Sequence, residues 1–237
     1  MVADPTAAAL RAAGRSAMRF ELRDVALMGI ILALGLGLAG PAHADRMSAT
    51  QQSKRIYRLP FADGTHVKVF ADFTTHRPAG RLDVLAVGGK SGSYRVVAAA
   101  AGHIVAIEDR YSKRETGGPG VVCHQNYVWI SHPDGEWTNY SHLAHGSVTG
   151  KAHLKVGDAV TAGQYLGDEG EVGCAMFKHV HFEVAVPDVK DPIDSGGFLK
   201  DNDNAKRERN PRFCGVPGRI VISGMSYTAT ACGKAAR

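Results

Sequence analysis

The stretch FKHVHFEVAV, residues 177–186, decides how this chain can fold. Successive side chains of a β-strand point to opposite faces of the sheet, so its alternating Val and Phe residues share one face, which belongs in the core. The other face carries His179 and His181, about 7 Å apart along the strand, followed by Glu183. Two imidazoles on one face are typical of a cleft, and we expect a functional site here, with Glu183 supporting a ligand or solvated.

Other runs of β-type sequence surround this strand. Turns rich in Gly, Pro, Asn and Asp separate them, and PDG at 133–135 is a strong hairpin signal. No stretch keeps the 3.6-residue apolar period of a helix. The sequence therefore predicts a mostly β protein with few helices, whose compact antiparallel sheet forms a sandwich or barrel-like core with a groove. The expected strands lie within residues 66–73, 94–109, 126–132, 136–143, 154–170 and 178–186.

Residues 1–44 have the features of a secretory signal peptide. Four arginines precede an apolar run from Val25 to Ala39, and an Ala-x-Ala pattern ends at Ala44. The run is shorter than the roughly 20 residues of a membrane span. We expect cleavage after Ala44, a secreted or periplasmic product, and no stable membrane insertion afterwards; an uncleaved N-terminal anchor is the alternative.

The rest of the chain is long enough for one domain with its own core. We expect a polar leader at residues 45–55, the β domain at 56–187 and a loop-rich extension at 188–237, where the composition becomes polar and rich in turns. The extension is expected to pack against the main domain, and its last part to form a small hairpin closed by a disulfide.

Four cysteines in an exported chain favour disulfides. No C-x-x-C pair is present, which argues against a structural zinc knot. Three pairings are possible, and we expect Cys123–Cys174 within the main domain and Cys214–Cys232 in the extension.

The charge of the chain is mildly positive. The whole sequence carries +5, and residues 1–44 contribute four arginines against three acidic residues, which leaves +4 after cleavage. Such a charge suits an anionic polymer only loosely. Because no run of Lys and Arg with interleaved aromatic residues exists, we expect no nucleic-acid partner.

Imidazole and carboxylate side chains of the kind that hold a catalytic zinc occur at three further positions. His142 ends the run WTNYSHL, where alternation would place it on one face with Thr138 and Tyr140, and FTTHRPAGRLDVLA offers His76 and Asp83. Three such ligands leave a fourth position for water, whose pKa falls to about 7 on zinc. The other histidines considered are expected on the surface: His103, His124, His132, His145 and His153.

Two other kinds of metal site fit less well. A cupin places the Glu several residues after H-x-H, whereas HVHFE has it two residues on. A carbonic-anhydrase-like site would use both His179 and His181 as ligands, and neither Asp83 nor the short strands support it.

The order of motifs resembles the lysostaphin/LytM-type zinc metalloendopeptidases over roughly residues 72–186. The matching stretches are VVAAAAGHIV (96–105), NYVWISHPDGEWTNYSHL (126–143), LKVGDAVTAGQYLGDEGEVG (154–173) and KHVHFEV (178–184). The resemblance implies a small β core with a groove, a zinc ion and hydrolysis of stem or cross-bridge peptides of peptidoglycan.

Carried over by position, the resemblance makes Asp83 and His181 zinc ligands. It makes His179 the general base or acid, and His142 the residue that stabilises the oxyanion or binds the attacking water. One departure concerns the family motif H-x-x-x-D, whose histidine would fall on Ala79. We expect His76, seven residues before Asp83, to take its place across a turn at RPAG, with His66 as the alternative.

Two further functions stay open. A degenerate member of the family would be a binding or regulatory module of the cell envelope that holds no zinc. The segments GHIVAIED and LKVGDAVTAGQYLG also resemble a biotinyl or lipoyl carrier, but the prosthetic lysine in a tight turn is missing. The oligomeric state is not predicted by the sequence.

Overall fold

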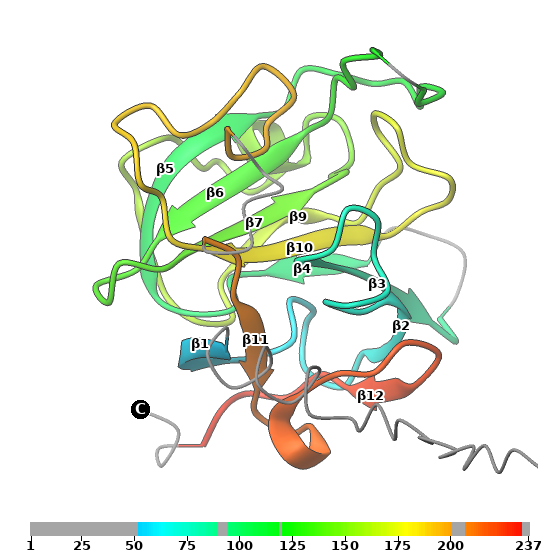
Figure 1. Ribbon diagram of the computed structural model, residues 1–237, viewed down its shortest axis with the longest axis vertical. Helices are drawn as coiled ribbons and strands as arrows, with labels where there is room; N and C mark the ends of the chain where they lie inside the picture. Colours follow the sequence, from blue (N-terminus) through cyan, green and yellow to red (C-terminus); the bar gives the residue numbers. More distant parts are fainter. Residues whose placement is uncertain (1–51, 90–93, 119, 201–206, 234–237) are drawn as a thin grey trace, which may run out of the picture. The chain divides into compact units, whose positions relative to one another are not determined.

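Eight antiparallel strands form one sheet in the described part of the chain (Figure 1). The computed structural model describes residues 52–89, 94–118, 120–200 and 207–233, which belong to one unit. Strand order in the sheet is β12-β2-β3-β10-β7-β6-β5-β8. Its members are β2 (His66–Ala71), β3 (Arg81–Val87), β5 (Gly102–Glu108), β6 (Tyr127–Ser131), β7 (Trp137–Ser141), β8 (Ala159–Val160), β10 (Val180–Ala185) and β12 (Ser226–Thr228).

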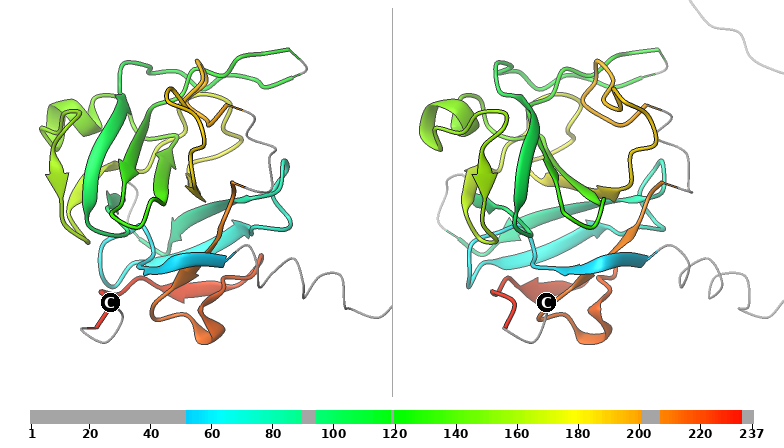
Figure 2. Two further views of the ribbon diagram at one scale, coloured as in Figure 1. Left: turned by 60° about the vertical axis from the view of Figure 1, so that its left-hand side comes forward. Right: turned by 90° about the vertical axis from the view of Figure 1, so that its left-hand side faces the viewer.

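Two small sheets accompany the large one. β4 (Arg95–Val97) pairs antiparallel with β9 (Tyr165–Asp168), and β1 (Gln52–Tyr57) pairs parallel with β11 (Asn210–Phe213). In Figure 2, β1 and the C-terminal strands lie together beside the cyan strands β2 and β3. Helical structure in the described residues is limited to two short turns: η1 (Ser147–Lys151), a π-helix, and η2 (Pro217–Arg219), a 3-10 helix.

The strand β10 lies in the middle of the large sheet and is buried on both faces. Its apolar side chains, Val180, Phe182 and Val184, enter the main core, as alternation predicts. Phe182 contacts Tyr57, Tyr140 and Phe213 through their rings. Burying such a side chain stabilises the fold by about 1.5–3 kcal/mol.

The predicted mostly β fold with few helices is confirmed, and the sheet is open instead of closed into a barrel. β8 pairs only with β5, and β12 only with β2, among the described strands, so both remain edges. The PDG turn joins β6 and β7 in a hairpin, as predicted.

The expected leader is wrong where the structure describes it, because residues 52–55 belong to β1. Glu136 explains the difference: its buried carboxylate accepts hydrogen bonds from the backbone N–H groups of Lys54 and Arg55 and from the hydroxyl of Tyr57. These contacts join segments that are far apart in the sequence, so local composition does not reveal them. Residues 45–51 and the expected signal peptide lie outside the described residues.

The C-terminal extension completes the fold of the main domain. Phe213, Val216 and Val221 are buried in the main core, and β12 extends the large sheet beside β2. The two strands of the expected hairpin, β11 and β12, pair with β1 and β2 instead of with each other.

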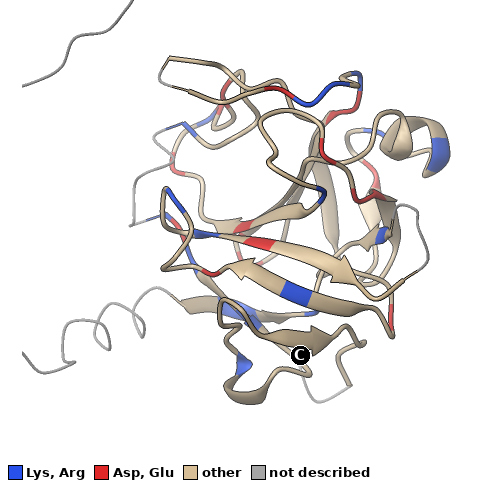
Figure 3. Ribbon diagram, turned by 90° about the vertical axis from the view of Figure 1, so that its right-hand side faces the viewer, with Lys and Arg blue, Asp and Glu red and all other residues tan. Residues whose placement is uncertain are grey.

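Both expected disulfides are present. Cys123 is bonded to Cys174, and Cys214 to Cys232, with sequence separations of 51 and 18 residues. Among the residues that the structure describes, no helix is long and apolar enough to cross a membrane. Charged residues of both signs are interspersed (Figure 3), in agreement with the diffuse charge of the sequence.

Candidate metal centre

Three adjacent strands place the site in register. His181 of β10 pairs with Asp83 of β3 on one side and with Ser141 of β7 on the other. Residues paired across an antiparallel sheet point to the same face. His179 lies one residue before β10 and, at position i−2, on the face of His181. The strand pairing alone therefore brings Asp83, His179 and His181 together.

The loop between β2 and β3 brings His76 to the same place. Asp72 accepts hydrogen bonds from the backbone and side chains of Thr74 and Thr75, and the N–H of Gly80 donates to the carbonyl of Phe73. These bonds fold the loop back on itself, so that His76 lies close to Asp83 although seven residues separate them.

Gly80 is required at the end of this loop. Its φ is +104°, and a Cβ there would lie 2.8 Å from Cγ of Glu208. The alternative ligand, His66, is exposed and pairs with Val87 at the far end of β3. His76 therefore lies beside Asp83, whereas His66 does not.

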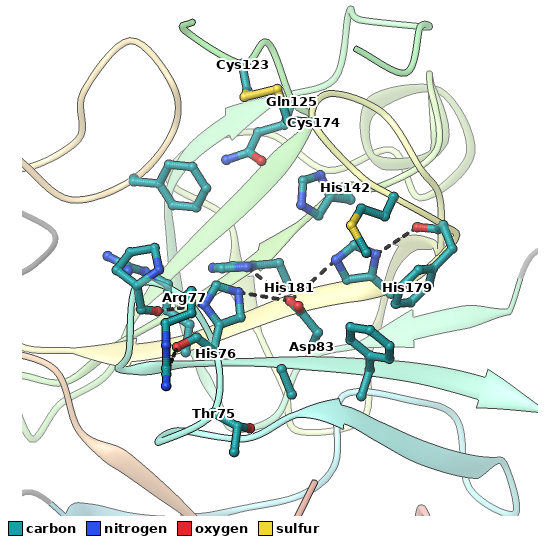
Figure 4. A pocket seen from close by; sticks show the side chains of 17 residues that line it. Thr75, His76, Arg77, Asp83, Cys123, Gln125, His142, Cys174, His179 and His181 are labelled. Carbon is teal, nitrogen blue, oxygen red and sulfur yellow. Dashed lines mark hydrogen bonds and ion pairs between the residues drawn. A yellow bond between two sulfur atoms is a disulfide. The ribbon is translucent and has the colours of Figure 1, made fainter. Parts of the chain in front are cut away.

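Three imidazole nitrogens surround one carboxylate oxygen (Figure 4). Oδ1 of Asp83 lies 3.3 Å from Nε2 of His76, 3.3 Å from Nδ1 of His181 and 3.4 Å from Nε2 of His179. This oxygen is buried and has no hydrogen-bond partner of good geometry among the described residues. The ligand atoms of His76, Asp83 and His181 all lie within 4.8 Å of one another, so these three side chains could hold a metal ion.

The spacing of these atoms fits zinc. Bonds of about 2.0–2.1 Å to nitrogen and oxygen in a tetrahedron separate neighbouring ligand atoms by about 3.3–3.4 Å. Both pairs that include Asp83, with His76 and with His181, have a separation of 3.3 Å. Two imidazoles and a carboxylate also form a donor set that zinc prefers, with a further position left for water or substrate. The residues present therefore fit the ion.

Backbone carbonyls determine which ring nitrogen of three histidines carries the proton. Nδ1–H of His76 donates to the carbonyl of Pro78 at 2.6 Å, that of His142 to Val172 at 2.8 Å, and that of His179 to Phe177 at 2.8 Å. A carbonyl only accepts, so in the neutral ring Nε2 keeps its lone pair. Such outer hydrogen bonds are typical of histidines that bind metal or move protons.

The electrostatics separate the histidines into two kinds. Burial, assisted by the neighbouring imidazoles, lowers the pKa of His142 to about 3. Burial likewise lowers the pKa of His181, to about 4, although Asp83 opposes the shift. Burial opposes the charged form of His179, but the neighbouring Asp83 carboxylate outweighs it and raises the pKa of this ring. Burial alone would raise the pKa of Asp83, but the three imidazoles together lower it strongly.

His142 reaches the site by leaving the strand pattern. Thr138 and Tyr140 face the core, where Thr138 Oγ1 donates to the buried Tyr140 hydroxyl, so the predicted shared face of these two with His142 is wrong. The φ of His142 is +64°, a left-handed conformation that ends β7 and turns the ring to the site. Its ring centroid lies 4.7 Å from that of His179.

Glu183 is buried and paired, so of the two expected alternatives, supporting a ligand or solvated, the structure excludes the solvated one. Its carboxylate lies 3.7 Å from Nε of Arg81, whose Nη2 lies 3.6 Å from Glu208. All three side chains are at most 2% exposed. The β3–β10 ladder pairs Arg81 with Glu183, two positions along from Asp83 and His181, so the cluster supports the strands that carry the site.

Of the histidines expected on the surface, His132 alone is buried. Its ring nitrogens bind the carbonyl of Ala101 and the hydroxyl of Thr138. The position at the start of a hairpin turn gave no sign of this. The other four are exposed, in agreement with the expectation.

The site opens into a cavity of about 450 Å³. Its apolar lining comes from several segments and includes Phe70, Phe177 and Phe198. Phe198 of the C-terminal extension contacts the ring of His181, with centroids 5.2 Å apart. The Cys123–Cys174 disulfide also lines the cavity. Sequence reasoning missed Phe198, because no motif marks it.

One known family matches the segment that carries most of these side chains. Residues 83–195 match peptidase family M23. The chain carries a peptidase family M23 domain. The resemblance to the lysostaphin/LytM type is thereby confirmed. Three of the four site histidines and Asp83 lie within the matched segment, whereas His76 precedes the M23 match.

Several solved structures are similar to this chain. A zinc-containing peptidase from Vibrio cholerae is 20% identical (TM-score 0.38), with 55% of this chain and 36% of that one covered. The antimicrobial peptidase lysostaphin from Staphylococcus simulans is 25% identical (TM-score 0.36), with 52% of this chain and 44% of that one covered. A mutant catalytic domain of the prophage-encoded M23 protein EnpA from Enterococcus faecalis is 20% identical (TM-score 0.38), with 60% of this chain and 88% of that one covered. The chain thus spans less than half the length of the first two. No curated protein matches it.

Proposed function

We propose that this protein is an exported zinc metalloendopeptidase that hydrolyses peptide bonds in the stem or cross-bridge peptides of peptidoglycan. The observation that carries the proposal is the group around Asp83: a buried carboxylate oxygen without a well-formed hydrogen bond, approached by imidazole nitrogens at 3.3–3.4 Å. An arrangement of this kind is costly to bury unless a cation completes it.

His76, Asp83 and His181 would hold the zinc ion through Nε2, Oδ1 and Nδ1. When bound, the ion supplies Lewis-acid chemistry, which polarises a carbonyl and lowers the pKa of water. The other ring nitrogen of His76 donates to Pro78, which fixes the orientation of the ligand. Nε2 of His181 has no hydrogen-bond partner among the described residues and remains buried in the site.

His179 is the proton carrier. The carbonyl of Phe177 holds its Nδ1–H, so Nε2 is the atom that accepts a proton from water and returns it to the leaving amine. Asp83 stabilises the imidazolium that forms, as the raised pKa of His179 indicates. A base whose protonated form is stabilised in this way is suited to hold a proton during the reaction.

His142 has a different role. With Nδ1–H donated to Val172 and a pKa of about 3, its Nε2 is an acceptor at neutral pH. It therefore binds and orients a water molecule that approaches the centre. Of the two roles that the resemblance allows, the water-binding one agrees with this tautomer, because stabilising an oxyanion requires a donor.

The peptidoglycan substrate is supported by the family resemblance and by the mild positive charge, and export by the features of residues 1–44. A non-catalytic envelope module is the second candidate. It is favoured by the position of His76, which lies seven residues before Asp83 and outside the segment that matches the M23 family.

Digestion of purified peptidoglycan, with mass spectrometry of the soluble products, tests the proposal. The wild-type protein is expected to release new amino termini at one kind of peptide bond, and to lose this activity with a zinc chelator. Intact peptidoglycan after incubation with zinc-loaded protein would favour the non-catalytic module.

A further inference from the structure

The connection between β9 and β10, residues 169–179, carries the two carbonyl groups that fix the rings of His142 and His179. Val172 accepts Nδ1–H of His142, and Phe177 accepts Nδ1–H of His179, each at 2.8 Å. These carbonyls lie on either side of Cys174 in the sequence. One short segment therefore determines the tautomer of two rings that come from different strands.

Backbone hydrogen bonds and one disulfide hold this connection in place. Its base is closed by the N–H of His179, which donates to the carbonyl of Gly170 at 3.0 Å. Gly173 exchanges backbone hydrogen bonds with Lys113 and Glu115, at 2.9 and 2.7 Å. The Cys123–Cys174 disulfide is its covalent tie, and both cysteines line the cavity.

We propose that the Cys123–Cys174 disulfide is a positioning device that holds His142 and His179 in the tautomer that their proposed roles require. This inference rests on the proposed function. A hydrogen bond of 2.8 Å is lost when its carbonyl moves away by about 1 Å, because donor and acceptor then lie beyond the usual limit of about 3.2 Å. Each ring is then free to adopt either tautomer and to rotate.

The backbone bond between His179 and Gly170 does not involve the cysteines, so the connection keeps its base when the disulfide is removed. Gly173 bonds to Lys113 and Glu115, which lie in the segment before Cys123 and can shift together with it. Displacement is expected between Val172 and Phe177, on both sides of Cys174. The described contacts there include the backbone bonds of Gly173, the bond from Arg114 to the carbonyl of Met176 and the ring contact of Phe177 with Phe70. The carbonyls move, while the proposed metal ligands belong to other segments. Zinc binding is therefore expected to persist.

The test compares Cys123→Ser/Cys174→Ser with Cys214→Ser/Cys232→Ser, which removes the disulfide between the β11 and β12 segments and is the matched control. The readout that needs neither metal nor substrate is a long-range ¹H–¹⁵N histidine spectrum of the zinc-free protein. Resonances are assigned with His142→Gln and His179→Gln. In wild type and control, both rings are expected as one Nδ1–H tautomer with a slowly exchanging proton.

In Cys123→Ser/Cys174→Ser both rings are expected to show mixed tautomers and fast exchange of Nδ1–H. With zinc bound, kcat is expected to fall about 10- to 100-fold, and KM to change much less. Unchanged tautomers in this variant, or the same change in the control variant, would overturn the proposal. Absence of peptide hydrolysis by the wild type would contradict the proposed function, and the spectra would still decide the positioning.

If the double variant does not fold, the disulfide is instead reduced after folding. A phosphine takes an oxygen atom from water to become the phosphine oxide, while the disulfide takes up two electrons and two protons to give two thiols. The sample is Cys214→Ser/Cys232→Ser, in which Cys123–Cys174 is the only possible intramolecular disulfide, and its spectra are compared before and after reduction. Loss of the fixed tautomers on reduction supports the proposal, and their persistence overturns it.

Discussion

His179 and His181 stand two residues apart on one face, yet they present different nitrogens to Asp83. His181 turns Nδ1 to the carboxylate, whereas His179 donates Nδ1–H to Phe177 and turns Nε2. Their pKa values differ in the same way, since that of His179 is raised and that of His181 is lowered. One ring is prepared to take up a proton and the other to remain a lone-pair donor.

Exchange of His179 for Gln should separate chemistry from metal binding. Glutamine keeps a polar side chain but cannot carry the proton, so kcat/KM is expected to fall by about 10²- to 10⁴-fold. Zinc content, measured by plasma mass spectrometry, should stay at the wild-type value. Loss of zinc together with activity would show that His179 is a ligand.

Among the elements, β10 connects the core to the site, because its two faces carry Phe182 and His181. Phe182→Ala is expected to lower the free energy of unfolding by about 3–5 kcal/mol through lost burial and a cavity. Phe70→Ala is the matched control, since Phe70 is 48% exposed. Urea unfolding measures both, and equal losses would contradict the assignment of Phe182 to the core.

The cluster of Arg81, Glu183 and Glu208 ties β3, β10 and the segment before β11 together. Burial and the neighbouring Glu183 raise the pKa of Glu208 to about 10. The folded chain therefore holds a proton that the unfolded chain loses above about pH 4.5. The stability from this group is fully present below that pH and falls as the pH rises toward 10, by at most about 1.4 kcal/mol per pH unit.

Glu208→Gln should flatten this pH dependence, because the amide is neutral like the protonated acid. Urea unfolding between about pH 5 and 9 compares the slopes of variant and wild type. Asp188→Asn is a control, since Asp188 forms a more exposed ion pair with Arg207. An unchanged slope in Glu208→Gln would mean that Glu208 is ionised in the folded chain.

At the scale of the whole molecule, the described residues after Pro187 contribute to the fold and to the site. They supply β11 and β12, the buried side chains of Phe213 and Val216, and Phe198 beside His181. A chain that ends at Pro187 is therefore expected to be unfolded or aggregated. Circular dichroism and gel filtration measure this, and a monomeric, cooperatively melting fragment would contradict it.

Much of this architecture follows from local sequence patterns. Alternation predicts the two faces of β10, and turn residues predict the β6–β7 hairpin. The patterns do not reach β1 or β12, whose partners lie at the other end of the described chain. They also misplace His142, because its left-handed backbone breaks the period of two. The turn residues suggest His76 as a ligand, but its position beside Asp83 is known only from the folded loop.

The most direct measurement is zinc stoichiometry in the wild type, His76→Ala and His66→Ala, by plasma mass spectrometry after dialysis against a weak chelator. The geometry predicts about one zinc per chain in the wild type and in His66→Ala, because the three-ligand group is intact in both. His76→Ala is expected to lose most of its zinc while it remains folded. Full zinc content in His76→Ala would contradict the centre described around Asp83.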